Sequence, residues 1–330
     1  MRIRSVAVVA AIMLSLAAWS PQATAQQKIR AAWSQTPGHL LPLIFTGKQG
    51  LVHYGKSYTV DLIRMQASGP MMQALVGGEI ELGALATTML YVLTNNAKAD
   101  VRLVGDVIQD RPGWWSSPFM VRNDSGITKV EDLKGKRIGT ASIGASSDTA
   151  MRTYLRRHGL TDKDFNTIEV AFGNIPAMLM AGKIDLGIIL PQFQKSVDHS
   201  QVKPLFTMND ATGTQQTVGI IMKKDVIDKN RAVLLDFFED YIRGTRWFLD
   251  PANREAAIKV AMDFTKQPRP SLDYFLTKKD YFRDPDARPS LEGAQQALNV
   301  SHEAGVFPTK FDVKPYIDFS LIDEAKQRIN

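Results

Sequence analysis

The feature that most constrains this chain is a sequence pattern that occurs twice, 104 residues apart. The segment MQALVGGEIELGALATT, from Met72 to Thr88, aligns with PAMLMAGKIDLGIILPQ, from Pro176 to Gln192. The copies share Leu75/Leu179, Gly78/Gly182, Ile80/Ile184, Leu82/Leu186 and Gly83/Gly187. Each copy predicts a helix ended by a glycine, then a buried strand and a polar loop. Either generic units agree by chance, or the chain forms two similar lobes that face a shared cleft.

Strands alternate with helices on both sides of the repeat, which predicts mostly parallel sheets covered by helices on both faces. In such sheets a ligand lies at the carboxyl ends of the strands, so the loops that follow the strands are candidate site segments. The expected strands span residues 28–34, 58–66, 80–86, 101–108, 119–122, 136–141, 167–171, 186–190, 202–207 and 217–222.

The last third of the chain has a helical pattern, with apolar residues at helix spacing at Leu234, Phe237, Phe238, Tyr241 and Ile242. Because this region lacks a strand series of its own, we expect it to pack on the first lobe. The predicted organisation is residues 1–25 as a signal peptide, 26–115 as the first part of lobe one, 116–220 as lobe two, and 221–330 as the helical return to lobe one.

The N-terminus predicts export. Arg2 and Arg4 precede an apolar run from Val6 to Trp19, and Ala23-Thr24-Ala25 fits a cleavage site before Gln26. A retained membrane anchor is the alternative, but the run is too short to span a bilayer comfortably. We therefore expect a periplasmic protein without stable membrane insertion.

Composition narrows the function classes. The formal charge is +6, or +4 without the two N-terminal arginines, and it is not clustered, so nucleic-acid binding is not expected. The chain has no cysteine, which rules out a disulfide framework, a CxxC metal site and a thiol nucleophile. Catalytic and nucleotide-binding motifs such as G-x-S-x-G, H-E-x-x-H and G-x-G-x-x-G are absent. We expect a monomer that is not an enzyme and uses no cofactor or metal.

One stretch, Glu131 to Leu160, predicts a strand, a Gly/Ser loop and a helix ended by Gly159. Ser146, Ser147 or Asp148 can cap this helix. The helix N-terminus is then a potential anion site, because free backbone N–H groups and the helix dipole point toward the space above the strand. An ordinary strand–helix connection with a good cap is the alternative.

These residues resemble a known family. The predicted signal peptide, the sequence DLKGKRIG from Asp132 to Gly139, the Ser/Gly loop after it, and the paired G-x-I-(D/E)-L-G motifs are similar to periplasmic substrate-binding proteins of ABC importers. The most similar group binds nitrate, sulfonates or taurine, and also contains binders of thiamine-pyrimidine precursors. The resemblance implies a type II two-lobe α/β fold with crossover strands near residues 117–122 and 217–223. It also implies a ligand held between closing lobes and an ABC permease as partner.

The resemblance also implies contact positions on the loops that match by motif. In lobe one these are Gln35, Thr36, Gly38, Ser68, Gly69, Thr87 and Thr88, and in lobe two they are Ser146, Ser147, Asp148, Asn174 and Gln192. Trp114 and Trp115 precede the first crossover and can either wall the cleft or pack in the core. His39 can contact ligand or be a surface histidine, and Ser147 and Asp148 can serve the helix instead of a ligand.

The expected contact loops contain no Arg or Lys, and the nearest such residue is Arg111. An anion would then depend on backbone N–H groups, hydroxyls and helix dipoles. Asp148 would oppose a simple anion but would suit a taurine-like zwitterion. The first expectation is an aliphatic sulfonate or a taurine-like anion. The alternatives are an aromatic or heteroaromatic carboxylate, a pyrimidine, or an exported enzyme or sensor module of the same fold.

Overall fold

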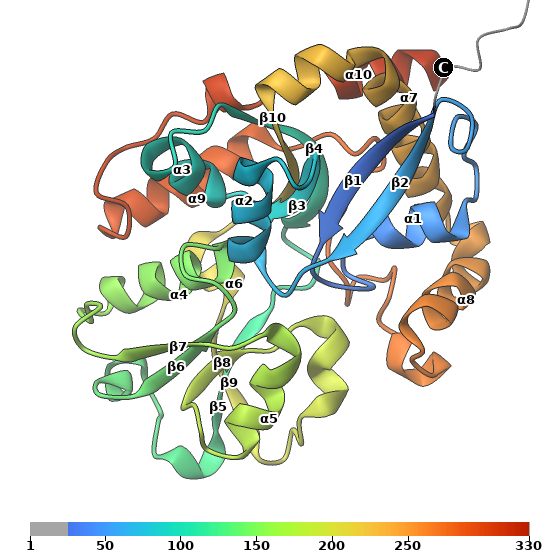
Figure 1. The fold of residues 1–330 in the computed structure, drawn as a ribbon. Helices are drawn as coiled ribbons and strands as arrows, with labels where there is room; N and C mark the ends of the chain where they lie inside the picture. Colours follow the sequence, from blue (N-terminus) through green and yellow to red (C-terminus); the bar gives the residue numbers. More distant parts are fainter. Residues whose placement is uncertain (1–25, 330) are drawn as a thin grey trace, which may run out of the picture.

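The computed structural model describes residues 26–329, so the predicted signal peptide lies outside the described residues. The chain forms two lobes, each built on a five-stranded sheet (Figure 1). The first sheet has the order β2-β1-β3-β10-β4, and the second has the order β7-β6-β8-β5-β9. The strands are β1 (Gln27–Trp33), β2 (Tyr58–Arg64), β3 (Leu82–Ala86), β4 (Val101–Asp110), β5 (Pro118–Arg122), β6 (Arg137–Thr140), β7 (Asn166–Glu169), β8 (Leu186–Ile188), β9 (Val202–Thr207) and β10 (Gln215–Lys223).

Strand direction is the same in four of the five strands of each sheet. Strands β1, β2 and β3 pair in parallel, while β10 pairs antiparallel with both β3 and β4. In the second sheet β6, β7 and β8 are parallel, and β5 runs against β8 and β9. The mostly parallel arrangement is confirmed, with β10 and β5 as the reversed strands at the same position in each order.

The helices of the first lobe are α1 (Leu41–Gly47), α2 (Ser68–Gly77), α3 (Met89–Tyr91), α7 (Lys224–Leu249), α8 (Arg254–Thr265), α9 (Leu291–Glu303) and α10 (Ser320–Ile329). The second lobe carries α4 (Ser146–Arg157), α5 (Ile175–Met180) and α6 (Met208–Thr212). Helix α9 also lies against α4 and α6, so the C-terminal region contacts both lobes. No helix within residues 26–329 is long and apolar enough to cross a membrane.

Both faces of the first sheet are covered, because successive side chains of a strand point to opposite faces. On β10, Ile220 and Met222 join a core with α1, α7, α8 and α10, whereas Ile221 joins a second core with α2, α3 and α9. A separate core fills lobe two around Phe119, Ile138 and Leu186. The helical C-terminal region thus packs on the first lobe as predicted.

The two copies of the sequence repeat also make equivalent hydrogen bonds with an arginine of their own lobe. On β1, the Arg30 guanidinium donates to the Glu81 carboxylate and to the Gly78 carbonyl. On β6, Arg137 donates in the same way to Asp185 and to the carbonyl of Gly182. Each arginine therefore ties the second strand in the order of its sheet, β1 or β6, to the helix-ending glycine and to the acidic residue before the neighbouring strand, β3 or β8. This correspondence favours two similar lobes over chance agreement.

The chain crosses between the sheets twice, through residues 111–117 and through residues 208–214, which include α6. The nine residues of β10 all belong to the first sheet, and β5 belongs to the second. The return to the first sheet thus begins at Gln215, earlier than the expected start at residue 221. The division into lobes at particular residues stays a prediction.

A buried carboxylate on α7 fixes the loop between α1 and β2. Asp240 is fully buried and accepts hydrogen bonds from the backbone N–H groups of Val52, His53 and Tyr54 and from the hydroxyl of Tyr58. The C-terminal region is therefore joined to the first lobe by polar contacts as well as by apolar packing.

Asp240→Ala should lower the free energy of unfolding by about 2–4 kcal/mol, because three backbone donors and a buried hydroxyl lose their acceptor. Urea denaturation measures the change. Asp236→Ala, one turn earlier on α7, is the control: its ion pair with Arg328 and its contact with His53 are partly exposed, so the loss should stay below about 1 kcal/mol. Equal losses of unfolding free energy in the two variants would contradict the conclusion that Asp240 holds the loop between α1 and β2.

Candidate functional site

A cavity lies between the two lobes and encloses about 610 Å³ of space, part of it open to solvent. Its walls come from the carboxyl ends of strands in both sheets, as expected for this architecture. Most of the lining surface is apolar, although only half of the lining residues are: Ala67, Ala84, Ala86, Ile108, Ala141, Ala145, Phe172, Ile188, Leu190, Met208 and Val218. The polar lining consists of Ser34, Gln35, His39, Ser68, Asp110, Ser117, Ser142, Ser146, Ser147, Thr217 and Tyr281.

The N-terminus of α4 forms one polar side of the cavity. The helix begins at Ser146, and its N-cap is Ala145, which provides no side-chain cap. The expected cap at Ser146, Ser147 or Asp148 is therefore wrong, because these residues form the first helical turn. The buried Ser147 hydroxyl has no hydrogen-bond partner among the described residues. This uncapped helix end with a free hydroxyl can bind a hydrogen-bond acceptor or an anionic group.

Asp110 forms a second polar side, at the end of β4. Its Oδ2 accepts a hydrogen bond from the Thr217 hydroxyl, and Oδ1 has no hydrogen-bond partner among residues 26–329. Burial raises the pKa of Asp110 to about 6, although the side chains of Thr217 and Gln215 oppose this shift. The carboxylate is 1% exposed, so its charge is largely removed from water.

His39 lies in the cavity wall and is 2% exposed, so it is not a surface histidine. Burial, together with the nearby Arg283 charge, lowers the pKa of His39 to about 3. The imidazole is therefore neutral at pH 7. Its Nδ1 has no hydrogen-bond partner among the described residues, which leaves it available to a ligand.

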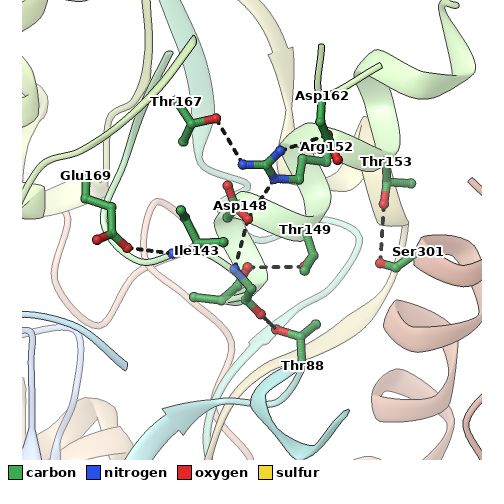
Figure 2. A network of polar contacts seen from close by, with 12 residues as sticks. Thr88, Ile143, Asp148, Thr149, Arg152, Thr153, Asp162, Thr167, Glu169 and Ser301 are labelled. Atoms are coloured by element: carbon green, nitrogen blue, oxygen red, sulfur yellow. Dashed lines mark hydrogen bonds and ion pairs between the residues drawn. The ribbon is translucent and has the colours of Figure 1, made fainter. Parts of the chain in front are cut away.

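Asp148 pairs within lobe two through its Oδ2, as Figure 2 shows, while its Oδ1 has no hydrogen-bond partner among the described residues. Its Oδ2 accepts from the Gly144 N–H and from Nε of Arg152, at 2.9 Å in each case. Arg152 also donates to Asp162 and Thr167. Asp148 does not line the cavity. Its position in the first turn of α4 fits the alternative in which its negative charge stabilises the helix N-terminus and does not contact a ligand.

Several predicted contact residues join the lobes to each other. The hydroxyl of Thr88 donates to the Gly144 carbonyl at 2.8 Å (Figure 2). The Nε2 group of Gln192 donates to Oε1 of Gln35 at 2.7 Å. At Gly69, an added Cβ would lie 2.7 Å from Oγ of Ser142, so the absence of a side chain permits this close approach.

The fifteen predicted residues thus divide into three groups. Gln35, His39, Ser68, Ser146 and Ser147 line the cavity. Thr36, Asn174 and Gln192 line a neighbouring hollow that shares Ser34, Gln35 and Phe172 with the cavity. Neither space is lined by Gly38, Gly69, Thr87, Thr88, Trp114, Trp115 or Asp148.

The two tryptophans pack beside the first crossing. Trp114 lies edge-on to Phe282, with the Lys278 ammonium 3.7 Å from its ring centroid. The Trp115 indole donates to the hydroxyl of Ser117. Both side chains are half-buried and neither lines the cavity, and of the two only Trp115 packs against the core of the first lobe.

Sequence reasoning missed Asp110, Thr217 and Tyr281. The expected strand ended at residue 108, whereas β4 continues to Asp110. An acidic residue directly after an apolar strand was a usable signal, because the carboxyl ends of strands form the site. Tyr281 comes from a segment between α8 and α9, and no local pattern connects it to the cavity.

Two five-stranded lobes with a cavity between them define the type II periplasmic-binding-protein fold, and solved structures share it. The periplasmic aliphatic sulphonate binding protein SsuA from Escherichia coli matches with a TM-score of 0.65 at 21% identity, covering 88% of this chain and 92% of that one. The periplasmic nitrate-binding protein NrtA from Synechocystis PCC 6803 matches with a TM-score of 0.73 at 16% identity, covering 93% and 90%. The desulfurization enzyme DszB matches with a TM-score of 0.63 at 11% identity, covering 92% and 100%.

The chain belongs to the NMT1/THI5-like family, which matches residues 58–254. No curated protein matches it. The matched residues include α4, Asp110 and Thr217, and exclude Gln35, His39 and Tyr281.

Asp110→Asn should raise the stability of the ligand-free protein at pH 7 and leave it unchanged near pH 3. The carboxyl of Asp110 loses its proton near pH 4 in the unfolded state and near pH 6 in the folded state. The free energy of unfolding of the wild type therefore falls between pH 4 and pH 6, whereas that of the variant does not depend on this group. At 1.36 kcal/mol per pKa unit, the gain at pH 7 approaches about 3 kcal/mol. Urea denaturation at several pH values measures it.

Asp132→Asn is a control of opposite sign, because backbone N–H groups of Thr128 and Lys129 lower the pKa of Asp132. Relative to wild type, that variant should lose stability as the pH rises through the range just below 4, and the deficit should stay constant at higher pH. If the difference in unfolding free energy between Asp110→Asn and wild type did not change with pH, the conclusion that Asp110 is a buried ionisable group would be wrong.

Proposed function

We propose that this protein is an exported solute-binding protein of an ABC importer. It holds a small organic molecule between its lobes in the periplasm and passes it, chemically unchanged, to a permease in the membrane. The observation that carries the proposal is a cavity walled by both lobes, where Ser147, His39 and Asp110 keep polar atoms without partners among the described residues. Membership of the family and the shared fold with SsuA and NrtA support it.

Some residues both line the cavity and form hydrogen bonds between the lobes. This is expected if the lobes close around a ligand. Ser146 lines the cavity, and its hydroxyl donates to the Thr217 carbonyl of the first sheet at 2.7 Å. Gln35 also lines the cavity and accepts from Gln192 of the other lobe. A ligand placed here would contact both lobes and favour the arrangement in which they touch.

The N-terminus of α4 is suited to bind a ligand with a hydrogen-bond acceptor group, such as a sulfonate or a taurine-like molecule. The free hydroxyl of Ser147 and the first N–H groups of the helix would receive that group. Phe172 and Tyr281 in the lining also suit a flat ring, so a heteroaromatic ligand stays an alternative.

The proposal is tested by mass spectrometry of small molecules released from protein purified under native conditions, followed by rebinding of the released compound. A single retained solute should return unchanged after incubation and should raise the melting temperature. DszB has the same fold and is an enzyme, so conversion of the solute into a product would overturn the proposal in favour of catalysis.

Ser147→Ala should weaken binding of the retained solute about fivefold, equivalent to about 1 kcal/mol for one hydrogen bond. Isothermal titration calorimetry measures the affinity. Ser196→Ala is the matched control, because Ser196 is an exposed serine of the same lobe outside the cavity. Unchanged affinity in Ser147→Ala would remove this hydroxyl from the site.

A further inference from the structure

We propose that Asp110 receives a positively charged or N–H-donating nitrogen of the ligand. The inference rests on the proposed function and narrows the class of solute. The bound molecule would carry such a nitrogen at one end and a hydrogen-bond acceptor at the other. A simple sulfonate or carboxylate anion without the nitrogen would be a poor ligand.

The first argument is the unused bonding capacity of the carboxylate. Asp110 lines the cavity at the end of β4, and only Oδ2 is occupied, by the Thr217 hydroxyl. The Gln215 amide on the adjacent strand influences the carboxyl, yet it makes no hydrogen bond of good geometry to Oδ1 within residues 26–329. A buried carboxylate oxygen without a donor is costly, so a ligand donor at this point would gain the full value of the contact.

The second argument is the charge balance of the cavity. None of the described lining residues is Arg or Lys. Of the lining residues that titrate, His39 is neutral at pH 7, and burial raises the pKa of Tyr281 above its usual range, so it stays protonated. Arg283, which donates to the carbonyl of Gly38 next to His39, is already paired with Asp280. Asp110 therefore supplies a negative charge that no lining side chain neutralises.

The third argument is the position of the two polar sides relative to each other. Thr217 links them, because its hydroxyl donates to Asp110 and its carbonyl accepts from the hydroxyl of Ser146, the first residue of α4. The negative carboxylate and the positive end of the helix thus lie on either side of one residue. A short dipolar molecule can contact both at once.

The experiment compares matched compounds with and without the nitrogen. The probes are taurine against ethanesulfonate and 4-aminobenzoate against benzoate, titrated at pH 7.5 into the native protein after its retained solute has been removed. In any pair that binds, the nitrogen-bearing compound should bind at least about tenfold tighter, the value of a hydrogen bond to a charged group. Asp110→Asn should reduce this preference to within about twofold, whereas Ser147→Ala should weaken sulfonate binding and keep the preference.

Asp106→Asn is the matched control. Asp106 is a buried carboxylate on the same strand, with its pKa also raised to about 6, but it accepts from Gln216 and from the Asp284 N–H and does not line the cavity. The nitrogen preference should persist in this variant. Equal binding within the pairs, or a preference that survives Asp110→Asn, would overturn the inference.

The composition of the solute retained during native purification provides a test that needs no variant. A retained solute with a basic or N–H nitrogen supports the inference. A retained solute without one overturns the role of Asp110 and leaves the proposed binding function intact. A protein that retains nothing and binds none of the probes would contradict both.

Discussion

The structure depends on one constraint: two sheets with the same strand order direct the carboxyl ends of their parallel strands toward a common cavity. In each sheet the reversed strand, β5 or β10, occupies the fourth position of the order. The paired arginines reinforce the likeness, because Arg30 and Arg137 make the same contacts to an acidic residue and a glycine carbonyl. The polar residues that follow these strands consequently face one another across the lobes.

Charge distribution then decides what the cavity can accept. Arg152 neutralises Asp148 within lobe two, so the N-terminus of α4 keeps its positive end directed at the cavity. Asp110 on the opposing sheet has its pKa raised to about 6, so it is mostly ionised at pH 7, and burial keeps His39 neutral. The result is a mostly apolar space with a positive and a negative side. This differs from a site built of cationic side chains, which would suit any small anion.

The fold by itself does not name the ligand, since sulphonate-binding, nitrate-binding and desulfurizing proteins share it at low identity. The differences must lie in the loops at the ends of the strands. In this chain those loops contribute mainly serine and alanine, and their small side chains permit the close approach seen at Gly69 and Ser142. The polar groups that we propose to select the ligand are few, and among them Asp110 carries the formal charge.

The sequence by itself determined the two-lobe plan and singled out the segment around Ser147, which the structure places in the cavity wall, because helix and strand periodicity and the repeat are local patterns. It also pointed to Ser68 and Gln35, which follow predicted strands. The tertiary structure alone decided that Asp148 pairs with Arg152 away from the cavity, whereas Asp110 lines the cavity with an oxygen that has no partner among residues 26–329. It also decided that the tryptophans pack beside the crossing. It also brought Tyr281 to the cavity. Burial and partner choice arise from contacts between residues distant in the chain, which no local pattern records.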